Sequence, residues 1–313
     1  MTTIIIFSLY FFTIIAITFV STRKTQKAES GQFSDDFFVG GRQLGPLTLA
    51  ILVAAGVVSA GTFIGTPGVS STMGPGYTLI FTGGAIPLSL YVLGIFGKKI
   101  NIVGRRTNSE TFIDVFRYRF ENNKLLMFTL VISIMTVLIV SVVSDFIGGS
   151  RVIQSMTGIP FEVSLIAFGG LITIYTALGG LRGVAFVGVL QGLIMTLGTI
   201  ILVIFYLFHF GGLEPIMERL SNIDHKLLTP NYGGEISIYE MMGYWFTYGI
   251  GLAALPWGVQ STLGYGSVKN MKRAIIIGII FVTIWITFVS SLGGAAGRAF
   301  APDLATPDLL FQL

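Results

Sequence analysis

The sequence predicts an all-α integral membrane protein of about eight transmembrane helices, organised as inverted repeats of five helices. The first observation is composition: of 313 residues, 53% are hydrophobic and 11% are charged, and the mean hydropathy is +0.82. Soluble domains carry about 25% charged residues. The second observation is a series of apolar runs that approach or exceed the roughly 20 residues needed to cross a bilayer. The third is that two of these runs, five apart along the chain, are interrupted by glycine or proline.

The apolar runs give the predicted spans. They are residues 4–21, 46–71, 77–97, 125–155, 161–179, 184–208, 239–264 and 273–297. We interpret the first run as a span and not a signal peptide, because no basic residue precedes it and no A-x-A cleavage site follows. With the N-terminus outside, fifteen Lys and Arg residues fall in inner loops and four lie near the outer face. Basic residues are enriched in cytoplasmic loops, so we predict this orientation.

The second span is interrupted near its middle. Its segment LAILVAAGVVSAGTFIGTPG (residues 49–68) contains Gly56, Gly61 and Gly65, interleaved with hydroxyl residues. Each glycine weakens a helix interior by roughly 1 kcal/mol relative to alanine. In lipid, an open backbone is tolerated only where it is buried in protein or lines a cavity. We therefore expect the helix to open here and to form half of a solute and ion site.

The seventh span repeats this feature. Its segment YEMMGYWFTYGIGLAALPWGVQSTLG (residues 239–264) is interrupted by several glycines and by Pro256. Proline in a helix interior costs about 3 kcal/mol. Two interrupted spans that run in opposite directions are typical of inverted repeats with a site at their interface. For any single glycine, helix packing remains the alternative, so the prediction depends on the pair of spans.

We expect one transmembrane domain over residues 1–313. It divides into an N-terminal helix and cytoplasmic loop (1–45), a first repeat (46–208) and the start of a second repeat (239–313). A short helix is predicted after span three, capped by Asn108 or Ser109 with Glu110 in its first turn. It lies either at the cytoplasmic interface or against the inner ends of the bundle. The segment between spans six and seven is predicted to be a structured outer loop that covers the solute entrance or only connects.

Seven short motifs, in their order and spacing, resemble the sodium:solute symporter family. They are DDFFVGGRQLG (Asp35–Gly45), SAGTFIGTPG (Ser59–Gly68), LGIFGKK (Leu93–Lys99), FIGGSR (Phe146–Arg151), YTALGGLRG (Tyr175–Gly183), QGLIM (Gln191–Met195) and PDLATPDL (Pro302–Leu309). FIGGSR, GGLR, QGLIM and the PDL pair are similar to the sodium/pantothenate permeases of that family.

The resemblance implies the five-plus-five helix symporter fold, preceded by one extra N-terminal helix and with an incomplete second repeat. It implies symport by alternating access in a bacterial inner membrane, with Na⁺ as the coupling ion and no other cofactor. The solute would be a small organic carboxylate, with pantothenate as the best candidate. The alternative solutes are proline or another monocarboxylate. The alternative function is that of a solute-sensing domain of a sensor kinase.

The resemblance also implies a sodium site at the first break. Its ligands would be the backbone carbonyls of Ala55 and Val58, together with a core helix that this chain lacks, so we expect the ion site to be half built. Carbonyl oxygens released by an unwound turn are hard ligands that suit Na⁺. No other metal site is expected.

The implied solute-binding residues come from both interrupted spans. Ser59, Gly61 and Thr62 begin the outer half-helix, whose N–H groups and positive dipole end suit a carboxylate. Trp257 and Gly258 match an aromatic–glycine pair that lies beside the solute in the family, although Trp257 is equally compatible with ordinary packing.

Two positions depart from the family pattern. Val57 stands where the family often has Asp or Asn, and Gly188 stands where it has an Asp three residues before the glutamine, here Gln191. Loss of that acid places normal ion coupling in doubt and fits the sensor alternative.

Other functional classes have little support. The spans contain no carboxylate cluster and the chain has no HExxH, GxSxG or phosphate-loop pattern, so we expect no enzyme and no catalytic residues. The absence of cysteine excludes thiolate metal sites and disulfides. The net charge of +4 reflects basic cytoplasmic loops, so the expected partners are the solute, Na⁺ and the lipid bilayer, with no nucleic acid. The oligomeric state stays open.

Overall fold

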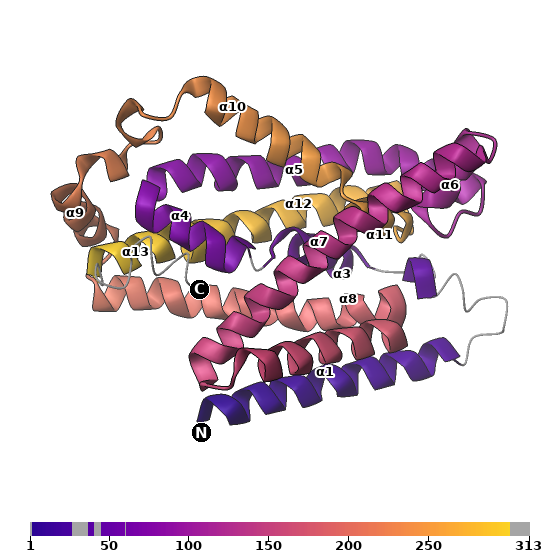
Figure 1. The fold of residues 1–313 in the computed structure, drawn as a ribbon, viewed down its shortest axis with the longest axis horizontal. Helices are drawn as coiled ribbons and strands as arrows, with labels where there is room; N and C mark the ends of the chain where they lie inside the picture. Colours follow the sequence, from indigo (N-terminus) through magenta and orange to yellow (C-terminus); the bar gives the residue numbers. More distant parts are fainter. Residues whose placement is uncertain (1, 27–36, 41–44, 60, 301–313) are drawn as a thin grey trace. The chain divides into compact units, whose positions relative to one another are not determined.

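A computed structural model describes residues 2–26, 37–40, 45–59 and 61–300, and the regular elements of this part of the chain are all helices (Figure 1). The α-helices are α1 (Thr2–Gln26), α3 (Pro46–Val57), α4 (Thr66–Met73), α5 (Pro75–Arg106), α6 (Phe112–Arg119), α7 (Lys124–Thr157), α8 (Phe161–His209), α9 (Leu213–Ile223), α10 (Ile238–Phe246), α11 (Pro256–Leu263), α12 (Val268–Trp285) and α13 (Leu292–Phe300). Shorter π or 3-10 elements are η2 (Gly61–Gly65), η3 (His225–Leu228), η4 (Tyr232–Gly234), η5 (Thr247–Gly251), η6 (Leu252–Ala254) and η7 (Ile286–Ser291).

The predicted spans correspond to these helices. Among the described residues, five stretches are long and apolar enough to cross a membrane: Pro75–Arg106, Lys124–Thr157, Phe161–Leu181, Gly183–His209 and Val268–Phe300. The bent pair Pro46–Val57 and Thr62–Met73 makes a sixth when it is counted as one span. The first predicted span lies in α1, whose apolar stretch Ile4–Val20 is shorter. The seventh predicted span is divided among α10, η5, η6 and α11.

Two of the predicted spans, 161–179 and 184–208, lie in helix α8, which is kinked between them at Gly180. This residue has φ 54° and ψ −161°, a conformation that side chains other than glycine rarely adopt. A Cβ at this position would lie 2.7 Å from Cδ2 and 2.8 Å from the carbonyl oxygen of Phe37. Glycine therefore permits both the kink and the close approach of the segment that precedes α3.

The chain forms two compact units. The first unit contains the described residues within Met1–Val53, Leu93–Gln191 and Leu255–Ile277, and the second contains those within Ala54–Val92, Gly192–Ala254 and Gly278–Leu313. Each unit contains residues from both predicted repeats, so the two units do not correspond to the two repeats. The boundaries of the repeats stay a prediction.

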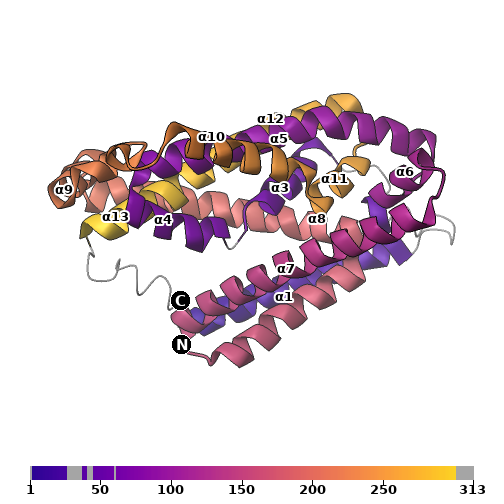
Figure 2. The ribbon, with the colours of Figure 1, turned by 45° about the horizontal axis from the view of Figure 1, so that its top comes forward.

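In the first unit, α1 runs alongside the first half of α8 (Figures 1 and 2). Ile14, Leu171 and Val187 form a buried apolar cluster between them. The side-chain amide of Gln191 donates a hydrogen bond of 3.0 Å to the hydroxyl of Tyr10 in α1. The N-terminal helix is therefore attached to α8 by both apolar packing and a polar contact.

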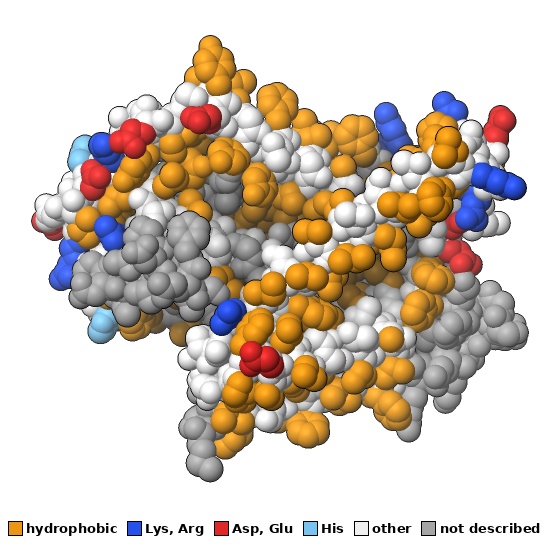
Figure 3. Space-filling model, viewed as in Figure 1, with side chains coloured by type: hydrophobic (Ala, Val, Ile, Leu, Met, Phe, Trp, Pro, Cys, Tyr) orange, Lys and Arg blue, Asp and Glu red, His pale blue; other side chains and the backbone are white. Residues whose placement is uncertain are grey.

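Helix α7 presents large apolar side chains outward. Leu125, Phe128, Ile139 and Val140 are each more than half exposed. Figure 3 shows hydrophobic side chains along this helix, while charged side chains gather around α6 and around the segment that follows α8. A lipid environment removes the cost of exposing such a surface, as expected for an integral membrane protein.

The short helix predicted after span three exists as α6, but its predicted cap is wrong. The N-cap is Thr111, whose hydroxyl accepts from the backbone N–H of Asp114 at 3.3 Å, while the Asp114 carboxylate accepts from the N–H of Thr111 at 2.9 Å. This reciprocal capping box satisfies two N–H groups at once. Asn108 instead adopts a positive φ of 51° in the preceding turn. The helix contacts α7 and α11 in the first unit.

Gln260 of α11 connects three backbone groups of the first unit. Its amide nitrogen donates to the carbonyls of Phe38 at 3.1 Å and Glu110 at 2.9 Å, and its amide oxygen accepts from the N–H of Phe112 at 3.0 Å. One side chain therefore joins α11, the start of α6 and the segment before α3.

In the second unit, α13 packs against α4 and α9 (Figures 1 and 2). The apolar core here joins Tyr206, Leu220, Leu227 and Ala295, which lie on α8, α9, η3 and α13. The segment between spans six and seven is therefore structured, as predicted. Helix α13 approaches α4 closely because Gly294 has no side chain: a Cβ there would lie 2.1 Å from the carbonyl oxygen of Pro67.

Replacing Gly294 by alanine tests this contact. Gly294→Ala is expected to lower the unfolding temperature of the purified protein in detergent, since overpacking a close contact costs about 1–3 kcal/mol. Gly297→Ala in the same helix is the control, because a Cβ at Gly297 would meet no atom within 4 Å. It is expected to leave the unfolding temperature unchanged or slightly higher. Equal unfolding temperatures for the two variants would contradict the close α4–α13 contact.

Candidate functional site

The second predicted span is broken where the sequence indicates. Helix α3 ends at Val57, and the helical segments on either side of the break, Pro46–Val57 and Thr62–Met73, meet at 63°. The N–H of Val58 still donates to the carbonyl of Ala54 at 3.2 Å, which completes the last turn of α3. The second segment starts from the carbonyl of Ser59, which accepts from the N–H groups of Thr62 at 3.0 Å and Phe63 at 3.2 Å. The predicted opening of this helix is confirmed.

The seventh predicted span is also interrupted. Helix α10 ends at Phe246, the backbone then widens into the π turn η5 and tightens into the 3-10 turn η6, and Leu255 is extended with φ −62° and ψ 138°. Pro256 begins α11, where its missing N–H costs nothing because first-turn N–H groups have no intrahelical partner. The glycines and proline thus produce a change of helix type followed by a break.

Helix α10 is held on α5 within the second unit. The indole N–H of Trp245 donates to the carbonyl of Ile80 at 3.1 Å. Its ring lies so close to α5 that a Cβ at Gly84 would be 2.3 Å from it. This contact lies two residues before η5 begins at Thr247 and three residues before Tyr248.

A cavity of about 370 Å³ lies in the second unit and is lined from both interrupted stretches. Its lining residues are Val57, Ser59, Thr62, Gly65, Thr66, Val69, Thr78, Ile86, Tyr248 and Leu252. None of the ten is charged and five carry a hydroxyl group. Pockets of about 300–1,000 Å³ with a mainly apolar wall and a few placed polar groups are typical of small-molecule sites.

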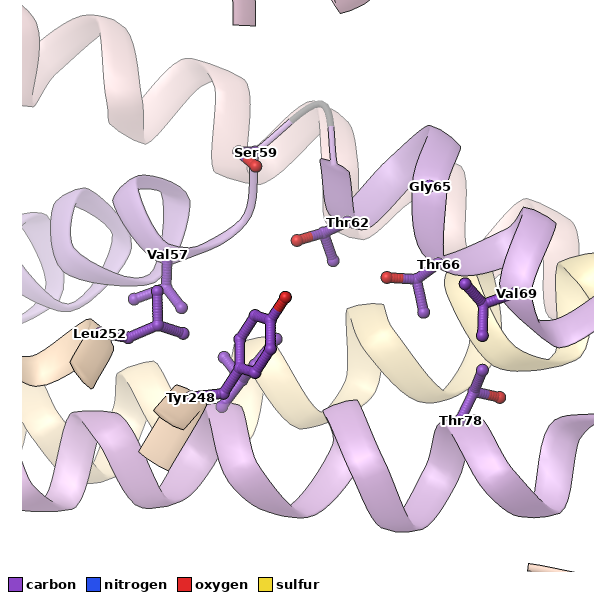
Figure 4. A pocket seen from close by; sticks show the side chains of 10 residues that line it. Val57, Ser59, Thr62, Gly65, Thr66, Val69, Thr78, Tyr248 and Leu252 are labelled. Carbon is purple, nitrogen blue, oxygen red and sulfur yellow. The ribbon is translucent and has the colours of Figure 1, made fainter. Parts of the chain in front are cut away.

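Three of the five hydroxyl groups, those of Thr62, Thr66 and Tyr248, point into the same part of this cavity. Figure 4 shows the hydroxyls of Thr62 and Thr66 on the side that faces Tyr248, whose own hydroxyl points toward Thr62. The hydroxyl of Thr78 points away from them and bonds carbonyls of its own helix. Thr62 and Thr66 are 7% and 9% exposed, whereas Tyr248 is 39% exposed. A solute in this cavity would meet hydroxyls that can both donate and accept hydrogen bonds.

The predicted residues of the first break lie at or next to this cavity. Ser59 and Thr62 line it, and Gly61 begins the π turn η2. The N–H of Thr62 is engaged by the carbonyl of Ser59, so Thr62 offers the cavity its hydroxyl. Ala55 and Val58 lie at the C-terminal end of α3, where helix carbonyls run out of intrahelical partners. Their role as sodium ligands stays a prediction.

Trp257 and Gly258 lie in α11, in the first unit, and are not among the ten residues that line the cavity. Gly258 is buried, and a Cβ on it would lie 3.6 Å from the side chain of Leu93. Trp257 is half-buried. Their predicted role beside the solute stays a prediction.

Sequence reasoning missed Tyr248 and Leu252 as cavity residues. Both belong to η5 and η6, the turns that replace α-helix in the seventh span. The available signal was the pair Gly249 and Gly251, which surrounds these turns and marks where the backbone changes its pitch. The break at Leu255, just before Pro256, lies later in the same span and agrees with the interruption that the sequence predicts there.

The described residues contain no group of three His, Asp or Glu side chains placed to hold a metal ion.

The comparisons with known proteins agree with one another on one family of transporters. Residues 37–310 match the sodium:solute symporter family. A sodium/pantothenate symporter of Escherichia coli (strain K12) is 35% identical over 286 residues, which are 91% of this chain and 59% of the relative. The sodium/pantothenate symporter of Haemophilus influenzae is 33% identical over 284 residues, 90% of this chain and 58% of the relative. The sodium/proline symporter of Escherichia coli is 26% identical, over 78% of this chain and 48% of the relative.

The chain thus spans about three-fifths of the length of the two pantothenate relatives. A solved structure of a Na⁺-coupled sialic acid symporter, in a substrate-bound outward-open state, matches with a TM-score of 0.75 and 20% sequence identity. It covers 96% of this chain, and the match covers 62% of the solved chain. This likeness confirms the predicted all-helical symporter fold. Because the family match extends over most of the sequence, the chain belongs to the sodium:solute symporter family, whose members are membrane transporters and not enzymes.

Proposed function

We propose that the protein containing this chain is a sodium-coupled symporter of a small organic carboxylate, with pantothenate as the best candidate, and that it works by alternating access. The observation that carries the proposal is the cavity lined by both interrupted stretches of the second unit. The choice of solute is supported by identities of 35% and 33% to two sodium/pantothenate symporters, against 23–28% to proline transporters.

The chemistry of the cavity fits such a solute. Pantothenate carries two hydroxyl groups and an amide, which match a wall of hydroxyl side chains. Its carboxylate is different, because none of the ten lining residues is charged. Moving an unpaired carboxylate out of water is costly. A co-bound Na⁺ at the carbonyls of Ala55 and Val58 would supply the missing positive charge, and this requirement favours coupled over uncoupled binding.

Within this proposal, Ser59, Gly61 and Thr62 contact the solute from the first break, and Trp257 and Gly258 contact it from the start of α11. The protein is a multi-pass component of a bacterial inner membrane with its N-terminus outside. Fifteen basic residues in the inner loops against four near the outer face support this orientation.

Proline is the second candidate solute, because several proline transporters align over most of the chain. Proline has a carboxylate but no hydroxyl groups. It would leave most of the hydroxyl wall unmatched, which is why we place it second.

Uptake by cells that express the gene at its natural length tests the proposal. Labelled pantothenate is expected to accumulate with an inward Na⁺ gradient and to stop accumulating when K⁺ replaces Na⁺. Excess unlabelled pantothenate should compete, whereas excess proline should not. Preferential uptake of proline would show that proline, and not pantothenate, is the solute. A lack of uptake of either solute in any Na⁺ gradient would favour the sensor alternative.

Thr62→Val tests the hydroxyl wall. The variant keeps the shape of the side chain and the backbone carbonyl but removes one hydroxyl from the cavity. The KM for pantothenate is expected to rise about twofold to tenfold, the range for a lost hydrogen bond of about 0.5–1.5 kcal/mol. Thr72→Val is the control, since the Thr72 hydroxyl bonds the carbonyls of Gly68 and Val69 on its own helix. If both variants have the parental KM, Thr62 is not a solute contact.

Gly188→Asp tests whether the departure from the family pattern weakens coupling. A Cβ at Gly188 would meet Leu52 at 3.9 Å, an ordinary contact, so a side chain can be placed there. The added carboxylate is expected to lower the Na⁺ concentration that half-saturates uptake. Gly188→Asn has the same size without the charge and is expected to leave that concentration unchanged. A shift of equal size in both variants would assign the effect to packing.

A further inference from the structure

The carbonyl of Thr62 is held by a side chain far away in the sequence. The hydroxyl of Ser290 donates to the Thr62 carbonyl oxygen at 2.7 Å. Both residues belong to the second unit, and they are 0% and 7% exposed, respectively. The carbonyl and the side chain of a residue share one Cα, so fixing the carbonyl also restricts where the Thr62 hydroxyl points in the cavity.

Ser290 lies in the π turn η7, which contacts both η2 and α4. The next residue, Ser291, accepts a hydrogen bond of 2.5 Å on its carbonyl oxygen from the hydroxyl of Ser70 in α4. The π turn thus gives one donor and one acceptor to the broken second span. Such turns are rare, and they occur often at functional sites.

The π turn is itself anchored to α8 within the second unit. The indole N–H of Trp285, a fully buried residue just before η7, donates to the hydroxyl of Thr196 at 3.3 Å. The hydroxyl of Tyr206 donates to the carbonyl of Phe288 in η7 at 3.4 Å. Long helix α8 therefore supports η7, and η7 in turn supports the half-helix that carries Thr62.

We propose that Ser290 is a positioning residue for solute binding: its hydroxyl fixes the Thr62 backbone and so holds the η2–α4 half-helix in the orientation that lines the cavity. The part that concerns solute affinity rests on the proposed function. The part that concerns the orientation of the half-helix does not, so each part has its own measurement.

The neighbouring serine provides a matched control. Ser291 is also 0% exposed, but its hydroxyl oxygen makes no hydrogen bond to the described residues. Ser291→Ala therefore removes a buried hydroxyl from the same turn and leaves the backbone contact with Ser70 intact. Removing an unsatisfied hydroxyl is expected to be neutral or slightly stabilising.

The first measurement is pantothenate uptake. Ser290→Ala is expected to raise the KM about twofold to tenfold, the range for one hydrogen bond, with little change in the maximal rate per folded transporter. Ser290→Thr, which keeps the donor, is expected to restore the KM. Because Ser290 acts through Thr62, combining Ser290→Ala with Thr62→Val is expected to raise the KM less than the product of the two single effects.

The second measurement does not need transport. The 313 residues contain no cysteine, so Val69→Cys introduces a single thiol on α4 at the cavity wall, at a position that is 38% exposed. Ser290→Ala is expected to raise the rate of maleimide labelling of this thiol by about fivefold, since a lost hydrogen bond of about 1 kcal/mol shifts an equilibrium by that factor. Ser291→Ala is expected to leave the rate at the parental value.

Equal effects of Ser290→Ala and Ser291→Ala on both the KM and the labelling rate would overturn the proposal. A failure of Ser290→Thr to restore the KM, in a protein whose labelling rate is parental, would also overturn the link to solute binding. If the parent takes up no pantothenate, the proposed function fails, and the labelling comparison still decides whether Ser290 positions the half-helix.

Discussion

An opened helix inside a membrane must find new partners for its backbone, because no water is available there to hydrogen-bond exposed N–H and C=O groups. The rest of this structure depends on how that requirement is met at the first break. The carbonyl of Ser59 accepts two N–H groups at once, and the carbonyl of Thr62 accepts the hydroxyl of Ser290. The break is therefore a specific, satisfied conformation, held from one side by the chain itself and from the other by η7.

The need to pair backbone N–H and C=O groups also explains why several polar side chains of the first unit contact the backbone. Asn101 of α5 donates to the carbonyls of Thr262 at 2.7 Å and Tyr265 at 3.3 Å, and Arg105 donates to the same Tyr265 carbonyl. Gln260 satisfies three more backbone groups near the start of α6. Side-chain amides, which can donate and accept, thus complete the backbone at the end of α11 as the serine hydroxyls do at η7. Both sets join the ends of helices to neighbouring segments of the same unit.

The sequence predicted those parts of the molecule that follow from local physics. Apolar runs identified the membrane helices, and the clustered glycines of residues 49–68 located the first break to within a few residues. Local reasoning failed at α6, where several residues were candidates for the N-cap. Thr111 is the N-cap because it forms a reciprocal pair with Asp114, which Asn108 and Ser109 cannot form. It could not find the contact of Ser290 with Thr62, because two residues separated by 228 positions carry no shared local pattern.

The neutral wall of the cavity bears on the proposed symport of a carboxylate solute with Na⁺. A carboxylate solute brings a negative charge to a site whose ten lining residues provide none to balance it, and Na⁺ alone would bring an equally unbalanced positive charge. In the proposed symporter, each ligand would therefore bind better when the other is present. By thermodynamic linkage, the factor by which Na⁺ raises the affinity for the solute equals the factor by which the solute raises the affinity for Na⁺. A fixed arginine or lysine in the wall would remove this mutual dependence, because it would balance the solute charge permanently. In the proposed symporter, a wall without charged residues would therefore let the ion gradient determine whether the solute binds.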